Sequence, residues 1–176
     1  MDTTIFYALN SLAGRSVVAD AVFIFLASWL IWIQAVAVLV FWLLSRARRL
    51  VPIISAALGA GLVWVINQFI GEIIFLPRPF ASLSNVHQLI SKSALEKSFP
   101  SDHAALVFAI ATSIFLVDRR WGSAFLIIAA LVSIGRVLAG VHFPSDVLVG
   151  AALGAACAVL AHYLIHHFLH TRHRRP

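Results

Sequence analysis

The sequence predicts an all-α, polytopic membrane helix bundle of about five transmembrane helices plus an N-terminal interfacial helix. The 176-residue chain is 61% hydrophobic and only 11% charged, with a mean hydropathy of +0.96, whereas an ordinary soluble domain is roughly 25% charged. Its apolar residues are also gathered into long runs, and roughly 20 helical residues cross a bilayer core of about 30 Å. The runs cover residues 17–44, 51–75, 104–117, 121–138 and 147–169.

The elements differ in length, and this sets how each one can meet the bilayer. The segment before the first run, TIFYALNSLAG, mixes apolar and polar residues and is typical of a helix that lies in the interface. The first run is too short for two spans but long enough for one tilted span. The third and fourth runs are short. Because no repeat, low-complexity tract or linker divides the chain, we expect residues 1–176 to form a single integral-membrane domain.

The positions of the basic residues indicate which way the bundle faces. A formal net charge of +6 could suit nucleic acid, but the arginines follow the first, third and fifth runs, which places them on one side of a five-span bundle. They are Arg46, Arg48, Arg49, Arg119, Arg120, Arg172, Arg174 and Arg175. By the positive-inside rule this side is cytoplasmic, so the other two connections face the extracytoplasmic side of a plasma membrane. We therefore expect membrane lipids, and no nucleic acid, around this chain.

Three polar clusters fall in the two outer connections, and each lies at a helix end. They are LPRPF at 76–80, SFPSDHA at 98–104 and GRVLAGVHFPSD at 135–146. Two clusters carry a proline and a small hydroxyl residue, which mark helix starts, and helix N-termini attract anions. Arg78 and Arg136 add guanidinium groups suited to bidentate phosphate contacts. The sequence therefore predicts a phosphate-binding pocket at this end of the bundle.

A bound phosphate gives chemical roles to three more side chains. His142 is the candidate nucleophile, and Asp146 would hold its imidazole in the reactive tautomer and stabilise the cation formed on attack. His103 would protonate the leaving oxygen and later activate water. Because arginines and helix-end amides would hold the phosphoryl charge, no cofactor and no metal is required. The alternative, a metal site of His103, His142 and Asp146, is disfavoured because two nearby arginines would repel a divalent ion.

Together the clusters resemble the three-part signature of the type 2 phosphatidic acid phosphatase superfamily of integral-membrane phosphatases. That signature is Lys, six residues, Arg-Pro; then Pro-Ser-Gly-His; then Ser-Arg, five residues, His, three residues, Asp. The matching residues are Arg78, Pro79, Pro100, Ser101, His103, Arg136, His142 and Asp146. The resemblance runs from about residue 67 to 146. It implies a phosphohistidine nucleophile at His142 with Asp146 as its partner and His103 as the acid, and phosphate binding by Arg78, Ser101 and Arg136.

The sequence departs from this signature at three positions. Gly71 stands where the family has lysine, Asp102 replaces the glycine of the second motif, and Gly135 replaces the serine of the third. These features look most like the bacterial branch that hydrolyses undecaprenyl diphosphate, so this reaction in a bacterial plasma membrane is the implied activity. Two alternatives remain open. One is a broader lipid phosphatase for phosphatidic acid or phosphatidylglycerol phosphate, and the other is a non-enzymatic membrane protein that binds anions.

Four residues are further candidates around the phosphate. Glu72 either orients Arg78 or reaches headgroup water. His87, Lys92 or Lys97, in the long outer loop, would contact the second phosphate of a diphosphate. The alternative for these three is a solvated loop near anionic headgroups.

The second and fifth runs carry small and polar residues that suit contacts between helices. Asn67 and Gln68 are expected to form interhelical hydrogen bonds rather than to contact substrate. Gly150 and Gly154 are expected to let the fifth helix approach a neighbour closely.

Overall fold

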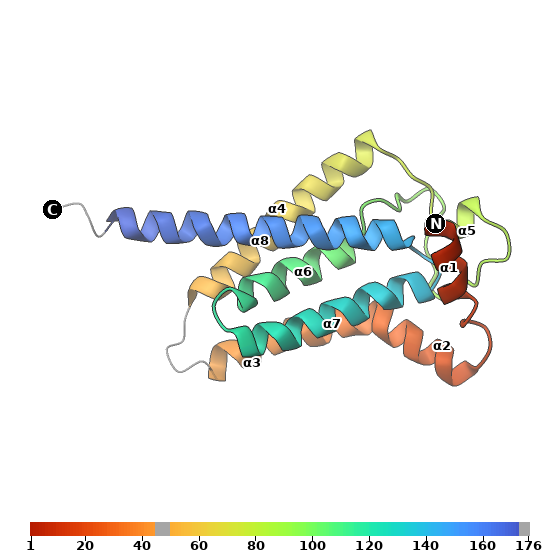
Figure 1. Cartoon of the computed structure of the whole chain (residues 1–176), viewed down its shortest axis with the longest axis horizontal. Coiled ribbons are helices and arrows are strands. Elements are labelled where there is room, and N and C mark those ends of the chain that lie inside the picture. Colours follow the sequence, from red (N-terminus) through yellow and green to blue (C-terminus); the bar gives the residue numbers. More distant parts are fainter. Residues whose placement is uncertain (45–49, 173–176) are drawn as a thin grey trace.

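The computed structural model describes residues 1–44 and 50–172, with side chains as far as residue 168. Within those ranges all regular structure is helical, which confirms the predicted fold class (Figure 1). The elements are α1 (Asp2–Asn10), α2 (Val17–Ile24), the π-helical turn η1 (Phe25–Trp29), α3 (Leu30–Leu44), α4 (Leu50–Ile73), α5 (Pro79–Ser82), α6 (Asp102–Phe115), α7 (Arg119–Leu138) and α8 (Pro144–Arg172).

Four of the described segments are long and apolar enough to cross a bilayer. They are Val17–Leu44, which joins α2, η1 and α3, then Leu50–Ile73, Arg119–Leu138 and Pro144–Phe168. Helix α6 has 14 residues and rises about 21 Å at 1.5 Å per residue, which is less than the thickness of a bilayer core. The short third helix is therefore as predicted.

The fourth helix is longer than its apolar run. Helix α7 has 20 residues because it begins at Arg119, where the side chain of Asp118 accepts a hydrogen bond from the Trp121 N–H and caps the helix. The prediction of a short fourth span is wrong for this reason, since the helix starts within the polar connection.

Helix α6 lies at the centre of the bundle, where it packs against α4, α7 and α8 (Figure 1). Two glycines of α8 allow this close packing. A Cβ atom on Gly150 would lie 2.6 Å from the carbonyl oxygen of Ser101, and one on Gly154 would overlap the carbonyl oxygen of Ala105. The predicted role of these glycines in helix approach is confirmed, and it brings the start of α8 against the start of α6.

Large apolar side chains cover the outer surface of the bundle. Trp29, Trp32 and Leu148, for example, are each more than 60% exposed. A contiguous apolar surface of this extent is stable only in contact with lipid. With its several apolar helices, the chain is a multi-pass membrane protein.

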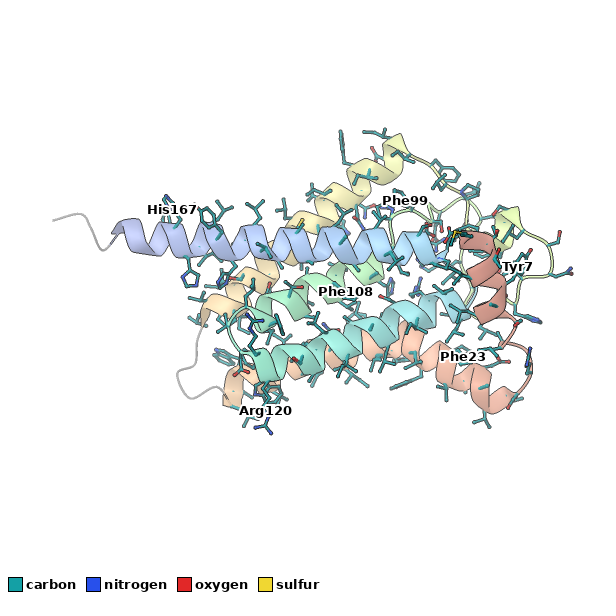
Figure 2. The ribbon with its side chains drawn as sticks, viewed as in Figure 1. Tyr7, Phe23, Phe99, Phe108, Arg120 and His167 are labelled. Atoms are coloured by element: carbon teal, nitrogen blue, oxygen red, sulfur yellow. The ribbon has the colours of Figure 1, made fainter. Side chains whose placement is uncertain are left out.

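The two ends of the bundle carry different groups. One end holds α1, α5 and the turn between α7 and α8, whereas Arg120, at the start of α7, lies at the other end (Figure 2). There the guanidinium carbon of Arg119 lies 4.5 Å from the centre of the Phe115 ring. Of the other predicted basic positions, Arg46, Arg48, Arg49, Arg174 and Arg175 lie outside the described residues, as does the side chain of Arg172.

Helix α1 closes the end of the bundle that carries the polar clusters. Phe6 is fully buried with Val137 and Val147 in one apolar cluster. The Asn10 side-chain amide donates hydrogen bonds to the carbonyl oxygens of Leu138 at 3.0 Å and of His87 at 2.9 Å. The helix predicted to be interfacial is thus tied to the turn that follows α7.

Candidate active site

His142 lies in the short turn, residues 139–143, that joins α7 to α8. Gly140 enables this turn, because its φ of +76° is readily accessible only to glycine. A Cβ atom at Gly140 would also overlap the carbonyl oxygen of His87 in the outer loop. The turn is therefore packed on the loop, and His142 is only 3% exposed.

The imidazole of His142 has one nitrogen facing Asp146. Nδ1 of His142 lies 3.5 Å from Oδ2 of Asp146, which is longer than an ordinary hydrogen bond. The four-residue spacing brings the two side chains together because Asp146 occupies the first turn of α8. This is the pairing that the sequence predicted. It leaves Nε2 as the nitrogen available for chemistry.

Asp146 is itself held by groups that the sequence analysis missed. Oδ2 of this buried carboxylate accepts hydrogen bonds from the Ser98 hydroxyl at 2.5 Å and from the Phe143 N–H at 2.8 Å. Ser98 is completely buried. The available signal was its place in the SFPSDHA cluster, three residues before Ser101. These bonds hold the carboxylate in place beside the imidazole.

Arg78 contacts the other nitrogen of His142. It directly precedes Pro79, the first residue of α5. Nη1 of Arg78 donates a hydrogen bond to the Val141 carbonyl oxygen at 2.9 Å and lies 3.3 Å from Nε2 of His142. A guanidinium group can only donate, so this contact requires an unprotonated Nε2 with its lone pair directed toward Arg78.

Arg136 is anchored by an irregular segment of the first span. Its Nη1 donates a hydrogen bond to the carbonyl oxygen of Ala27 at 3.2 Å, and Ala27 lies in the π-helical turn η1. Gly135 permits the approach, since a Cβ atom there would lie 2.8 Å from the backbone nitrogen of Ala27. The departure from serine at residue 135 is thereby explained by packing. The π-helical turn was not predicted, because its residues are apolar like those of the helices on either side.

Ser101 and His103 lie at the start of α6, as predicted. The Ser101 side chain is buried and caps the helix by accepting a hydrogen bond from the Ala104 N–H at 3.5 Å. The Ser101 backbone N–H donates to the Asp146 carbonyl oxygen at 3.1 Å, which joins the starts of α6 and α8. His103 is half-buried. It lies close enough to Arg136 and His142 to interact with them electrostatically.

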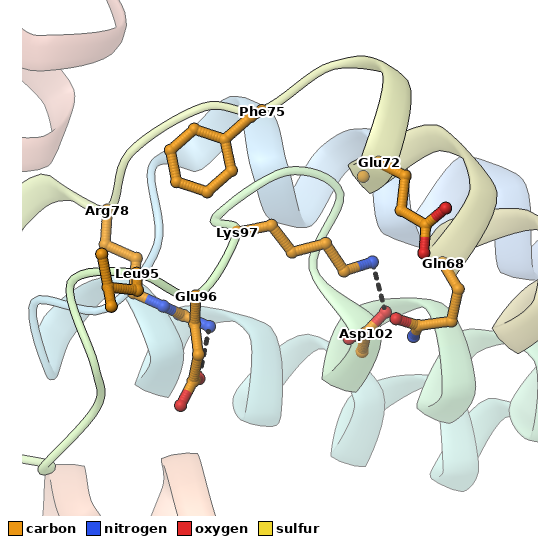
Figure 3. Close-up of a pocket in the computed structure, with 9 residues that line it drawn as sticks. Gln68, Glu72, Phe75, Arg78, Leu95, Glu96, Lys97 and Asp102 are labelled. Atoms are coloured by element: carbon orange, nitrogen blue, oxygen red, sulfur yellow. Dashed lines mark hydrogen bonds and ion pairs between the residues drawn. The ribbon is translucent and has the colours of Figure 1, made fainter.

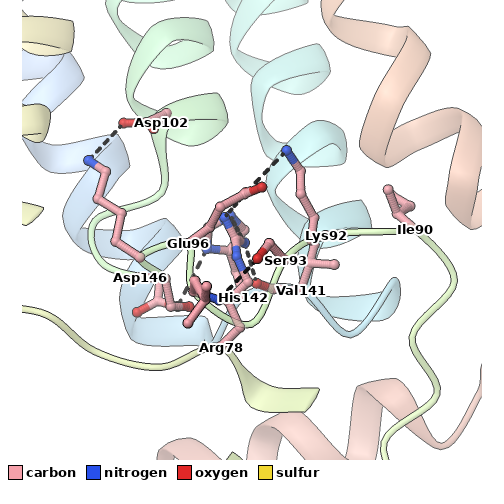
Figure 4. Close-up of polar contacts among 12 residues, drawn as sticks. Arg78, Ile90, Lys92, Ser93, Glu96, Asp102, Val141, His142 and Asp146 are labelled. Atoms are coloured by element: carbon pink, nitrogen blue, oxygen red, sulfur yellow. Dashed lines mark hydrogen bonds and ion pairs between the residues drawn. The ribbon is translucent and has the colours of Figure 1, made fainter. Parts of the chain in front are cut away.

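A carboxylate from the outer loop occupies the exposed side of Arg78. Oε2 of Glu96 lies 3.3 Å from Nη2 of Arg78 and 3.5 Å from Nζ of Lys92 (Figure 4). The carboxylate that contacts Arg78 is therefore Glu96 and not Glu72, for which the sequence had suggested this role. Glu72 is exposed on the last turn of α4 and lines the same cavity. His87 lies elsewhere, with its backbone bonded to Asn10 and its ring against Gly14.

Lys97 extends across the position left open by Gly71. Its Nζ donates a hydrogen bond to the Asn67 carbonyl oxygen at 2.6 Å and lies 3.4 Å from Oδ1 of Asp102. The side-chain amide of Asn67 also donates to Asp102, at 3.1 Å, which confirms its predicted role between helices. Gln68 lines the cavity instead. These contacts place an ammonium group beside the second cluster.

A cavity of about 490 Å³ opens beside these groups (Figure 3). Two of its lining residues, Arg78 and Lys97, are cationic. The others are Gln68, Gly71, Glu72, Phe75, Leu95, Glu96 and Asp102. Three of the others, Glu72, Glu96 and Asp102, are acidic, and Phe75 and Leu95 add exposed apolar side chains. The cavity thus combines charged groups of both signs with an apolar surface.

The surroundings of His142 and Arg78 set their charge. Burial lowers the pKa of His142, and the cationic Arg136 and Arg78 lower it further, although the Asp146 carboxylate opposes them. Burial also lowers the pKa of Arg78, against the opposing effect of Glu96, but arginine stays charged at any physiological pH. The site at neutral pH therefore combines a neutral imidazole with permanent cations.

Glu96 responds differently because it is more exposed. Its limited burial raises the pKa, but Lys92 and Arg78 outweigh this and hold the pKa of Glu96 below its ordinary value. Glu96 is thus an anion at neutral pH, seated against the guanidinium group of Arg78.

Comparison with known proteins identifies the class of membrane enzyme to which this fold and site belong. The model of the PAP2 superfamily matches residues 49–169. The chain belongs to this superfamily of membrane phosphatases, which confirms the resemblance that its three clusters carry. The crystal structure of Aquifex aeolicus LpxE has a TM-score of 0.70 with this chain at 29% identity, covering 91% of this chain and 93% of that one.

Two curated relatives are similar over most of the chain. The bacitracin transport permease protein BcrC of Bacillus licheniformis is 33% identical, over 88% of this chain and 75% of its own length. The undecaprenyl-diphosphatase BcrC of Bacillus subtilis is 32% identical, over 84% of this chain and 76% of its own length.

Proposed function

We propose that this chain removes the terminal phosphate of undecaprenyl diphosphate, giving undecaprenyl phosphate and inorganic phosphate, through a phosphohistidine at His142 on the extracytoplasmic face. The main observation in support of this proposal is the contact of 3.3 Å between Nη1 of Arg78 and Nε2 of His142. It places the candidate nucleophilic nitrogen beside a cation suited to a phosphoryl oxygen, and the phosphoryl group would take the place of this contact when it enters. The name of the Bacillus subtilis relative supports the choice of substrate.

In the first step, Nε2 of His142 attacks the terminal phosphorus. The bond from this nitrogen to phosphorus forms as the bond to the bridging oxygen breaks, and that oxygen leaves with the lipid phosphate and its electron pair. His103 supplies a proton to the leaving oxygen where one is needed. Asp146 stabilises the imidazolium through Nδ1, and its distance of 3.5 Å from that nitrogen shortens as positive charge develops.

In the second step, water attacks the phosphohistidine. His103 accepts a proton from the water, the nitrogen–phosphorus bond breaks, and inorganic phosphate leaves. Arg78, Arg136 and the N–H groups at the start of α6 around Ser101 hold the equatorial oxygens in both steps.

The experiment is phosphate release from undecaprenyl diphosphate by the purified protein in detergent with a chelator. Phosphatidic acid and phosphatidylglycerol phosphate are run beside it, and His142→Ala is the blank. We expect the diphosphate to be hydrolysed fastest, with a phosphorylated protein that is stable to base and labile to acid. A preference for the other lipids would replace the proposed substrate by the broader phosphatase.

The transport name of the Bacillus licheniformis relative makes a non-enzymatic role the second candidate. Hydrolysis that disappears in His142→Ala while the protein keeps its melting temperature supports the enzyme. Protein that releases no phosphate from any of these lipids, but binds them equally well with or without His142, would contradict it.

The side of the membrane on which the site lies can be tested separately. A single cysteine in place of Ser84, which is exposed in the outer loop, would be placed in a chain whose Cys157 is replaced by alanine. We expect an impermeant maleimide to label it in intact cells or spheroplasts. Labelling only after the membrane is opened would reverse the orientation.

A further inference from the structure

We infer that Lys97 is the specificity-determining cation that binds the phosphate retained by the lipid, and so favours diphosphates over monophosphates. The inference rests on the proposed function, because it assigns a partner to the part of the substrate that His142 does not attack. It also selects one residue from the loop candidates. Lys97 lines the cavity beside Arg78, whereas Lys92 is bound to Glu96.

The outer part of the Lys97 side chain, from Cδ to Nζ, packs over Gly71 and is hydrogen-bonded at its end. Its stem crosses the open face of Gly71, where an added Cβ atom would overlap Cδ of Lys97 and would lie 2.9 Å from Cε and from Nζ. The side chain is only 16% exposed. An ordinary loop lysine keeps its ammonium group in open solvent, so this fixed position indicates a role for the charge at the site.

The ammonium group keeps the capacity to bind substrate. It has three donors, of which two are directed to the Asn67 carbonyl oxygen and the Asp102 carboxylate in the described part of the chain. The third can serve a phosphate oxygen in the cavity. Asp102 also balances the positive charge of Lys97 at the start of α6.

The chemistry of the leaving group explains why this cation matters for diphosphates only. When the terminal phosphorus is transferred to His142, the bridging oxygen gains negative charge and departs as part of the lipid phosphate. Lys97 donates a hydrogen bond to this phosphate and stabilises the developing charge. A lipid monophosphate leaves as an alcohol and has no second phosphate for Lys97 to bind.

The test compares farnesyl diphosphate with farnesyl monophosphate, which share one chain and differ by the retained phosphate. Lys97→Met should lower kcat/KM for the diphosphate by roughly tenfold to a hundredfold, the usual effect of removing a charge-assisted hydrogen bond. Turnover of the monophosphate should change by less than about threefold, and this also shows that the variant is folded. Lys97→Arg, which keeps the charge, should retain most of the preference.

Two further variants test whether the position of the Lys97 ammonium group matters as well as its charge. Gly71→Ala keeps Lys97 but forces its stem to move, so the preference for the diphosphate should fall in the same direction. Ser84→Ala, at an exposed position of the same loop and outside the site, is the control and should keep the wild-type ratio. A ratio that Lys97→Met leaves unchanged would overturn the inference while the phosphatase proposal stands. If the wild-type protein cleaved none of farnesyl diphosphate, farnesyl monophosphate and undecaprenyl diphosphate, the proposed function itself would be contradicted.

Discussion

The turn between α7 and α8 and the loop between α5 and α6 each bring a side chain to Arg78, but they hold it in different ways. In the turn, His142 and Asp146 are at most 3% exposed, and Asp146 is fixed by hydrogen bonds from Ser98 and Phe143. In the loop, the Glu96 side chain is 46% exposed and pairs with Lys92 at 32% exposure. The first pair is almost fully buried, whereas the second is partly exposed.

This difference indicates that the two regions serve different steps of the proposed reaction. Buried charges interact strongly and lose much when a partner is removed, whereas exposed ion pairs contribute little. The turn is therefore suited to the bond-making steps, and the loop to the choice and exchange of the phosphate that enters. Substitutions at His142 and Asp146 should then have much larger effects than substitutions at the exposed pair of Glu96 and Lys92.

The largest effect is expected for Asp146→Asn. The amide keeps the shape but cannot stabilise the imidazolium, so phosphorylation of His142 should slow by roughly 10³-fold to 10⁴-fold, as for the aspartate of a serine protease triad. Rapid-quench measurement of the phosphoenzyme checks this. Ser98→Ala is the graded control and should lose only about tenfold, because it removes one hydrogen bond. Equal losses in both variants would mean that the carboxylate acts only through folding.

Arg136→Lys is expected to have the next largest effect. The guanidinium group can bond to the Ala27 carbonyl oxygen and still present other donors to phosphate, whereas an ammonium group lacks this planar fork. We expect kcat to fall by roughly tenfold to a hundredfold. The same change at Arg120, at the far end of the bundle, should have no effect. Unchanged kcat in Arg136→Lys would remove Arg136 from the phosphate site.

The charge state of His142 sharpens the contrast between buried and exposed groups. Because burial lowers its pKa, the imidazole stays neutral as the pH falls and gains its proton only well below the ordinary value of about 6.5. At pH 5.5 an ordinary histidine would be only about 10% neutral, but His142 should be mostly neutral. Histidine NMR of labelled protein, with His142→Asn to assign the signal, measures this. A midpoint near 6.5 would contradict it.

Much of this architecture follows from the sequence because hydropathy and helix-start chemistry are local properties. The apolar runs predicted the spans, and the proline and serine pairs predicted the starts of α6 and α8. The convergence of the three clusters also followed, since each lay at a helix end on the same side of the bundle.

Other features depend on how distant segments meet, and no local pattern encodes them. Glu96 reaches Arg78 only because the outer loop folds back across the site. The π-helical turn at Ala27 is defined by backbone hydrogen bonds that its apolar sequence does not distinguish from an α-helix. The choice of Lys97 over Lys92 likewise required the path of the loop.

A smaller effect is expected where α1 supports the turn from outside. Both oxygens of the Asp2 carboxylate accept hydrogen bonds from Ser145, one from its N–H at 3.0 Å and one from its hydroxyl at 2.6 Å. Asp2 thus caps α8 from another helix, and Asp2→Ala should lower the free energy of unfolding by about 1 kcal/mol. Thermal unfolding in detergent checks this. Thr3→Ala, which changes an exposed neighbour, is the control.

The smallest effect, and one of opposite sign, is expected for Glu96→Gln. Its carboxylate lies 3.3 Å from Nη2 of Arg78, so a phosphate that binds this nitrogen must displace it. The neutral amide binds the guanidinium group less strongly, and inhibition by inorganic phosphate should strengthen by about twofold to fivefold, within the range of an exposed ion pair. Lys92→Met frees Glu96 from its other partner and should weaken phosphate binding slightly. If Glu96→Gln weakened phosphate binding instead, Glu96 would be positioning Arg78 for substrate rather than competing with it.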